Sequence, residues 1–201
     1  MITIVDYGMG NLGSIRNMLK RIGAQSEITG DPEKIEQAEK IILPGVGAFD
    51  AAMQLINSGG LLDVLNKKAL GEKIPVLGIC LGMQLLTESS EEGVLPGLNW
   101  INAKTLRFPK NEKLKIPHMG WNFTHIVHHS PLTENFTEEF RFYFVHSYCV
   151  HVTDENNSIL KTSYGIEFDS AIQKDNIFGV QFHPEKSHKY GMTLLRNFAL
   201  L

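Results

Sequence analysis

The residue in this chain best placed for chemistry is a cysteine between two glycines. Cys80 ends an apolar run that starts at Pro75, has Gly78 and Gly82 two residues to either side, and precedes a helical pattern. That is the layout of a nucleophile elbow, a tight strand-to-helix turn in which small neighbours leave room for a reactive side chain. We expect the turn to expose the sulfur at a helix N-terminus, which favours thiolate, and to let the Leu81 N–H donate to an oxyanion. This segment alone leaves a buried structural cysteine open as the alternative.

A histidine and a glutamate far downstream can complete that chemistry. The apolar run 177–182 predicts a buried strand, and it leads into His183-Pro184-Glu185. Pro184 favours an extended conformation at His183, which would place His183 and Glu185 on one face. His183 could then take the thiol proton, while Glu185 orients the imidazole and stabilises its cation. A lone histidine is more often a satisfied polar residue, but the order Cys, His, Glu indicates a triad.

These motifs, 78–84 and 183–185, resemble those of the class I glutamine amidotransferases. Within that family the chain is similar to the glutaminase subunits of imidazole glycerol phosphate synthase, which serve histidine biosynthesis, and the resemblance runs from Ile2 to Phe198. The further segments that carry it are 6–11 (DYGMGN), 44–49 (PGVGAF), 118–122 (HMGWN), 144–148 (FVHSY) and 181–187 (QFHPEKS).

The resemblance implies an activity and a partner. It implies that Cys80, His183 and Glu185 hydrolyse L-glutamine to glutamate and ammonia. The ammonia would pass to a (β/α)₈-barrel cyclase subunit, which forms imidazole glycerol phosphate and an aminoimidazole carboxamide ribotide. No cofactor and no metal are implied.

The resemblance also assigns the remaining site residues. The oxyanion donors would be Leu81 and, after a peptide flip between residues 45 and 46, the region of Val46 and Gly47. Substrate groups would be held by Gln84, Glu92, Ser147 and Tyr148, with Glu92 on the α-ammonium and the backbone of 147–148 on the α-carboxylate. The partner interface would include Asn11, Trp121 and Lys186.

Two other functions remain open. A related glutaminase could feed a nucleotide-sugar amidotransferase in surface-polysaccharide synthesis. Alternatively, the segment Gly8–Gly13 satisfies G-x-G-x-x-G between a strand and a helix, so a nucleotide-binding module is a remote alternative. The histidines at 125, 128, 129 and 151 invite a metal site, but no cysteine or carboxylate cluster surrounds them, and we expect a solvated loop.

Composition bounds the class of protein. With 201 residues, a net charge of −3 and no linker or repeat, the chain predicts a single α/β domain over 1–201 without a nucleic-acid footprint. Two cysteines make no disulfide framework and fit a reducing compartment. The N-terminus lacks a signal pattern, and no apolar run approaches membrane-spanning length, so we expect a cytoplasmic protein without membrane contact.

The elements that would position the triad alternate between strand and helix in the first half. This alternation predicts an open, mixed but mainly parallel sheet with flanking helices, of the flavodoxin-like type that the family resemblance implies. The loops 7–11 and 44–47 and the Cys80 elbow would share the carboxyl edge of that sheet, where ligands bind. Strands are expected at 2–5, 26–28, 40–43 and 74–79, helices at 11–22, 48–56, 61–70 and 190–201, a short helix after Asp31, and shorter mixed strands over 98–180.

Overall fold

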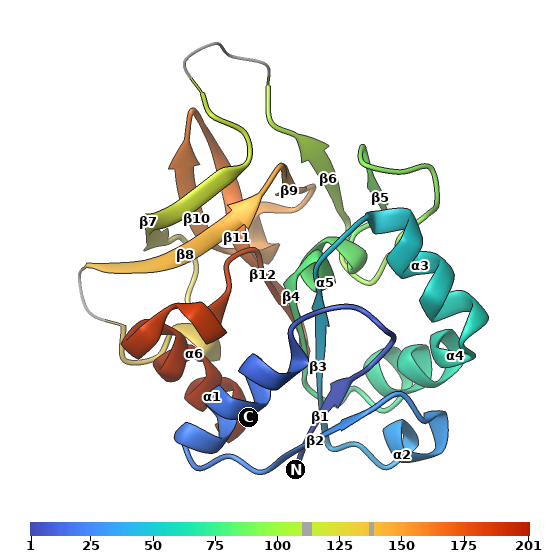
Figure 1. The fold of residues 1–201 in the computed structure, drawn as a ribbon. Coiled ribbons are helices and arrows are strands. Elements are labelled where there is room, and N and C mark those ends of the chain that lie inside the picture. Colours follow the sequence, from blue (N-terminus) through green and yellow to red (C-terminus); the bar gives the residue numbers. More distant parts are fainter. Residues whose placement is uncertain (110–113, 137–138) are drawn as a thin grey trace.

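The structure is a computed structural model that describes residues 1–109, 114–136 and 139–201. Its centre is a set of five parallel strands in the order β2-β1-β3-β4-β12 (Figure 1). They are β1 (Ile2–Val5), β2 (Ser26–Thr29), β3 (Lys40–Gly45), β4 (Val76–Cys80) and β12 (Ile177–Val180). This is the flavodoxin-like order 2-1-3-4-5, which confirms the predicted sheet.

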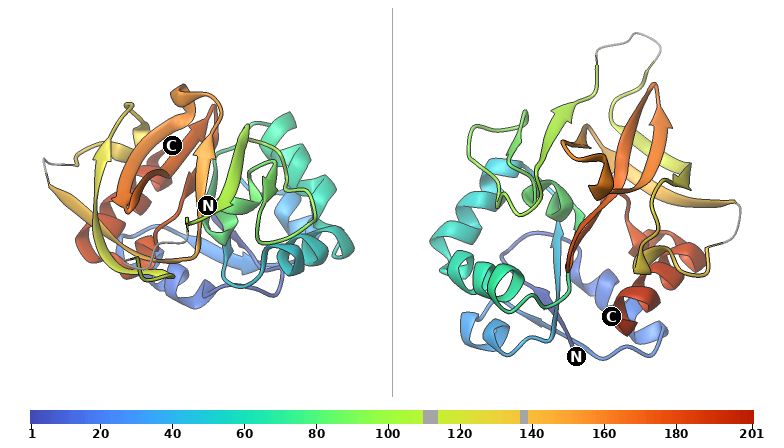
Figure 2. Two further views of the ribbon diagram at one scale, coloured as in Figure 1. Left: turned by 90° about the horizontal axis from the view of Figure 1, so that it is seen from above. Right: turned by 180° about the vertical axis from the view of Figure 1, so that it is seen from behind.

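Helices cover both faces of the parallel strands, as Figures 1 and 2 show. One face is covered by α1 (Leu12–Arg21) and α6 (His188–Leu200). The other is covered by α2 (Pro32–Glu36), α3 (Phe49–Ser58) and α4 (Leu61–Asn66), which continues into a π-helical turn at Lys67–Gly71. Two separate apolar clusters result, one on each side of the sheet. Burial of these two faces is what holds the strand ends, and therefore the site, in place.

The second half of the chain extends the sheet with antiparallel strands. From β12 the order continues through β11 (Ile166–Lys174), β10 (Ser158–Tyr164), β7 (His118–Ile126) and β8 (Phe140–His146). A branch from β11 carries β9 (Tyr148–Val152), β6 (Ala103–Arg107) and β5 (Ser89–Ser90). The corner between β8 and β9 at Ser147 brings this half over the carboxyl end of β4, because the Val145 carbonyl lies 3.9 Å from the Cys80 sulfur.

Most predicted elements are confirmed, with three local corrections. The third strand continues through Pro44 into Gly45, which pairs with Cys80, so this part of the expected loop belongs to β3. The helix after the elbow, α5 (Leu81–Leu85), has only five residues. His125 and His151 lie in β7 and β9, not in a solvated loop, because both segments pair with neighbouring strands.

No helix in the described part of the chain combines the length and the apolar character needed to cross a bilayer.

The sharpest packing constraint lies beside Cys80. A Cβ on Gly82 would overlap the Leu43 carbonyl oxygen, and one on Gly78 would overlap the backbone of Gly82. Strand β4, helix α5 and the end of β3 therefore approach as closely as backbone allows. Only glycine permits this arrangement at 78 and 82.

Gly82→Ala is therefore expected to lower the free energy of unfolding by about 3 kcal/mol, because rigid backbone must move to admit the methyl group. Gly13→Ala is the matched control. Its Cβ would meet nothing within 4 Å, and alanine should stabilise helix α1 by about 0.5–1 kcal/mol. Urea denaturation of the three proteins measures both effects. Equal stability of Gly82→Ala and the unaltered protein would contradict the close approach.

Candidate active site

The backbone at Cys80 has the geometry of an elbow. Cys80 has φ +55° and ψ −110° and lies between β4 and α5. A non-glycine residue at positive φ is strained by order 1–3 kcal/mol and persists only where surrounding structure enforces it. The close approach of Gly82 to Leu43 supplies that enforcement. The predicted strand-to-helix turn is thus present.

The expected exposure of the sulfur is wrong, because Cys80 is only 7% exposed. The β8–β9 corner covers it, and the sulfur lies 3.9 Å from the Val145 carbonyl oxygen and 3.7 Å from Nε2 of Gln181. It still faces a cavity of about 370 Å³. Access to the sulfur is therefore from this cavity and not from open solvent.

All the residues predicted to bind substrate or oxyanion line that cavity. They come from four parts of the chain, which the sheet topology gathers at the carboxyl ends of the strands. The lining includes Val46, Gly47, Leu81, Gln84, Glu92, Ser147 and Tyr148, together with Pro117, Val145 and His146, which were not predicted. The structure brings these groups together; their individual roles stay predictions.

His183 and Glu185 form a direct hydrogen bond. His183 Nδ1 lies 2.8 Å from Oε1 of Glu185, and both side chains are 3% exposed. The carboxylate can only accept, so Nδ1 carries the proton and Nε2 is the basic nitrogen. His183 itself is extended, as predicted, but a 3₁₀ turn over Pro184–Lys186 follows it and brings the pair together in place of the expected extended chain. The turn forms because Lys186 N and the Ser187 hydroxyl both donate to the His183 carbonyl, at 3.0 and 2.6 Å.

The electrostatics of His183 favour its cation. Burial lowers the pKa of the imidazole, but interaction with Cys80 and with the Glu185 carboxylate outweighs burial and raises the pKa to about 10. His183 Nε2 is buried, and no atom of the described residues lies in hydrogen-bonding position to it. The negative charge of a Cys80 thiolate is nevertheless close enough to act on it. The free ring nitrogen is thus available for the thiol proton.

Glu92 lies at the cavity wall as a partly buried carboxylate. Burial raises its pKa, the hydrogen bond from Phe49 N opposes that rise, and the charge of Asp50 adds to it. Glu92 Oε2 accepts from Phe49 N at 3.1 Å. This bond anchors the carboxylate at the start of α3 and directs the group toward the cavity.

Tyr7 is a buried residue at the site that sequence reasoning missed. Its hydroxyl donates to the Pro44 carbonyl at 2.6 Å. Burial raises the pKa of Tyr7, and negative charge on Cys80 raises it further, so the hydroxyl stays a donor. Tyr7 therefore fixes the end of β3 immediately before the predicted oxyanion residues. Its place in the expected loop 7–11 gave the only signal.

Two buried histidines were also missed as chemistry-bearing groups. His118 Nδ1 lies 2.9 Å from His146 Nε2, and His146 Nδ1 lies 2.6 Å from the Tyr148 carbonyl. The carbonyl can only accept, so each ring carries its proton on Nδ1. Burial lowers the pKa of His118 to about 4 and that of His146 to about 3. The pair is neutral and holds the corner at Tyr148.

The three predicted interface residues are exposed. Asn11 caps α1, which packs against the Pro184–Lys186 turn. Trp121 is 41% exposed and stacks on His188 with ring centroids 5.5 Å apart. Lys186 Nζ lies 5.8 Å from the Tyr143 ring, which itself contacts Trp121. Trp121 and Lys186 therefore share Tyr143 as a neighbour, and Asn11 begins the helix that packs against the turn carrying Lys186.

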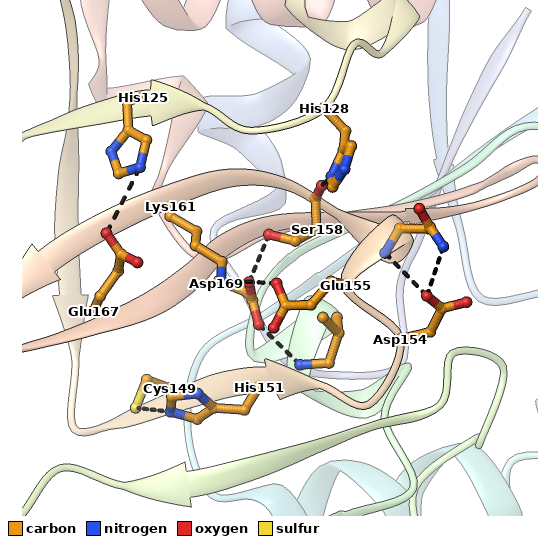
Figure 3. Close-up of polar contacts among 12 residues, drawn as sticks. His125, His128, Cys149, His151, Asp154, Glu155, Ser158, Lys161, Glu167 and Asp169 are labelled. Atoms are coloured by element: carbon orange, nitrogen blue, oxygen red, sulfur yellow. Dashed lines mark hydrogen bonds and ion pairs between the residues drawn. The ribbon is translucent and has the colours of Figure 1, made fainter.

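The other histidines each have a separate partner. Figure 3 shows His125 beside Glu167 at 3.7 Å, His128 on the Ser158 carbonyl at 2.8 Å and His151 on Cys149 at 3.5 Å. His129 pairs with Glu134 at 2.8 Å. Within residues 1–109, 114–136 and 139–201, no three metal-ligating side chains come together.

The local structure of the glycine-rich segment 8–13 disfavours phosphate binding. The Asp6 carboxylate accepts from Gly8 N at 3.0 Å. One amide that a phosphate would use is therefore taken, and an anion already stands beside it.

A family model described as glutamine amidotransferase class-I matches residues 3–201. The chain belongs to this family. It is 59% identical over 198 residues to imidazole glycerol phosphate synthase subunit HisH 2 of Methanococcus maripaludis, with 98% of each chain covered. It is 50% identical over 201 residues to the protein of the same name from Pseudomonas aeruginosa, with 100% of each chain covered.

Solved structures with the same fold agree with the family match. The chain matches the crystal structure of a glutamine amidotransferase with a TM-score of 0.77 at 18% identity, covering 100% of this chain and 99% of that one. It matches PurLQS from Thermotoga maritima with a TM-score of 0.75 at 20% identity, covering 98% and 96%. The predicted class I glutamine amidotransferase fold is confirmed.

The neutral histidine pair predicts an acid-dependent stability. The folded-state pKa values of about 4 and about 3 lie below the ordinary 6.5, so unfolding takes up protons below pH 6.5. Stability from the pair is complete above pH 6.5 and is lost as pH falls toward those values.

His118→Asn keeps an N–H donor for His146 but removes one titrating ring. Its free energy of unfolding should fall less steeply between pH 6 and 5 than that of the unaltered protein, because its unfolding takes up about one proton fewer. His129→Asn, which changes an exposed ring, is the control and should keep the original slope. Identical slopes in all three urea titrations would rule out the neutral pair.

Proposed function

We propose that this chain is the glutaminase subunit of an imidazole glycerol phosphate synthase. It hydrolyses L-glutamine and delivers ammonia to a cyclase subunit in histidine biosynthesis. The observation that carries the proposal is an elbow cysteine that faces a cavity lined by every predicted substrate residue and that interacts with a histidine held by Glu185. The relatives named above, covered over their full length, support the same function.

Acylation begins at the sulfur. The Cys80 thiolate attacks the carboxamide carbon of glutamine, and the carbonyl oxygen takes up the negative charge. The backbone N–H of Leu81 and an N–H from Val46 or Gly47 donate to that oxygen. His183, protonated on Nε2, then gives its proton to the departing nitrogen, and ammonia leaves.

Deacylation repeats the sequence with water. Neutral His183 takes a proton from water, whose oxygen attacks the γ-glutamyl thioester. The tetrahedral oxyanion occupies the same N–H groups, and the C–S bond breaks to release glutamate and regenerate the Cys80 thiolate beside the His183 imidazolium. Glu185 holds Nδ1–H throughout, so it stabilises each imidazolium without receiving the proton.

Recognition of the amino-acid head group follows from the charges at the cavity. Glu92 is the anionic partner for the α-ammonium. The backbone at Ser147–Tyr148, held by His146, faces the α-carboxylate, and Gln84 supplies an amide between them.

The partner is a (β/α)₈-barrel cyclase seated on the face that carries Asn11, Trp121 and Lys186. Trp121 offers the exposed aromatic surface that interface anchors commonly use. Ammonia must reach its acceptor without becoming ammonium in bulk water, since protonation removes its nucleophilic lone pair. A seated barrel would provide that protected path.

The function is tested by reconstituting the complex with a barrel cyclase from the same genome and its ribulosyl phosphate substrate. Glutamine should support product formation, and Cys80→Ala should lower the glutamine-dependent rate by on the order of 10⁴-fold or more. Added ammonium salt at high pH is the control, because it should restore product with the Cys80→Ala complex if docking is intact. Product formed from glutamine by Cys80→Ala, or none by the unaltered complex, would refute the proposal.

A further inference from the structure

A glutamine that the mechanism above does not use lies directly against the nucleophile. Gln181 is fully buried just beyond β12, two residues before His183. Its Nε2 lies 3.7 Å from the Cys80 sulfur, and its Oε1 accepts from Gln84 Nε2 at 3.1 Å. Gln181 N donates to the Ser170 carbonyl at 2.9 Å, which fixes the backbone from which the side chain reaches the sulfur.

Neighbouring groups determine which end of the Gln181 amide faces the sulfur. The Tyr148 carbonyl can only accept a hydrogen bond. Gln84 Nε2 lies 3.4 Å from this oxygen, so the amino end of Gln84 must face it. That same amino group then meets Gln181, which must present Oε1 to it. The amino group of Gln181 is left for Cys80.

The Tyr148 carbonyl is itself held in place. His146 Nδ1 donates to it at 2.6 Å across the β8–β9 corner, and His118 donates to His146. Asn122 Nδ2 lies 3.2 Å from the remaining nitrogen of His118 and 3.0 Å from the Ser163 carbonyl. The orientation of every donor between Asn122 on β7 and the Cys80 sulfur is therefore determined by its neighbours.

We propose that Gln181 is a further catalytic residue, which donates an amide N–H to the Cys80 thiolate and stabilises it in the resting enzyme. The proposal rests on the proposed glutaminase function only in taking the thiolate as the reacting form. Cys80 is only 7% exposed, so its side chain has lost most of its water, and a negative charge on the sulfur needs protein donors. A charge-assisted hydrogen bond is shorter and stronger than a neutral one, so the N–H helps the thiolate more than the thiol.

Gln181 complements His183 because its donor does not titrate. The Val145 carbonyl, 3.9 Å from the sulfur, accepts from the thiol and repels the thiolate. His183 offsets this only while it is protonated. The Gln181 amide offsets it at every protonation state of the imidazole.

The test measures the alkylation rate of Cys80 by iodoacetamide against pH, with the adduct located by peptide mapping. Gln181→Met keeps an unbranched side chain of similar length but has no donor. Its rate profile should have a midpoint about one pH unit higher, as expected for the loss of one hydrogen bond to a charged group. Gln181→Glu, which places an acceptor beside the sulfur, should move the midpoint further in the same direction.

A kinetic readout separates this role from a structural one. The kcat for glutamine of Gln181→Met should fall about tenfold at neutral pH and recover as pH rises through the new midpoint, because the thiolate then forms without help. The matched control is Gln173→Met, on β11, whose amide donates to the Asp175 carbonyl. It should leave midpoint and kcat unchanged.

Each outcome decides the proposal. An unchanged midpoint in folded Gln181→Met, or an equal shift in Gln173→Met, overturns it. If Gln181→Met does not fold, Gln84→Met takes its place, because loss of the Gln84 amide frees the Gln181 amide to rotate. An upward shift of the Gln84→Met midpoint supports the proposal, and an unchanged midpoint overturns it. Alkylation needs no glutamine, so a midpoint shift in a protein without glutaminase activity would reject the proposed function and leave the Gln181 donor standing.

Discussion

The site depends on one constraint, the contact of backbone with backbone where β3, β4 and α5 meet. Gly82 leaves no room for a side chain against the Leu43 carbonyl. This packing holds Cys80 at φ +55°, a conformation that would otherwise relax. It also pairs Gly45 with Cys80, so the chain that follows β3 passes the sulfur. The same contact therefore places both the proposed nucleophile and the proposed oxyanion donors, and it does so at the cost of backbone strain at Cys80.

The neighbouring strand and the antiparallel half complete what that contact begins. Strand β12 pairs in parallel with β4, with Val180 opposite Ile79, and delivers His183 beside the elbow. The 3₁₀ turn then brings Glu185 back to Nδ1 of the imidazole. Across the cavity, the β8–β9 corner excludes water from the sulfur and holds the Tyr148 carbonyl. Asn122 on β7 and the Cys80 sulfur thus lie at the two ends of one hydrogen-bonded chain, in which two neutral histidines are the central links.

The parts of this architecture that follow local rules could be predicted from the sequence. Strand and helix alternation, the short helix after Asp31 and the elbow all rest on neighbouring residues. Contacts between distant residues that no motif marks could not be predicted. Gln84 and Gln181 are 97 positions apart, and a glutamine within an apolar strand gives no periodic sign of its partner. The sulfur is covered by a carbonyl 65 positions away, which no local pattern reveals. The expectation that the chain stays extended from His183 to Glu185 was based on Pro184, but a proline restricts only the residue before it. The turn that follows forms because the Ser187 hydroxyl donates to the His183 carbonyl, which the sequence does not reveal.

The central claim, that Cys80 is the nucleophile for glutamine, is tested most directly by trapping it. A diazoketone analogue of glutamine carries the same head group and an electrophilic carbon at the position of the carboxamide, so it should alkylate the attacking atom. Burial raises the pKa of Cys149 to about 12, and its thiol donates to the Leu106 carbonyl, so this second cysteine should not react. Mass spectrometry of the digested, inactivated complex should find one adduct, on Cys80, and excess glutamine should protect against it. An adduct on Cys149, or inactivation without an adduct on Cys80, would contradict the account.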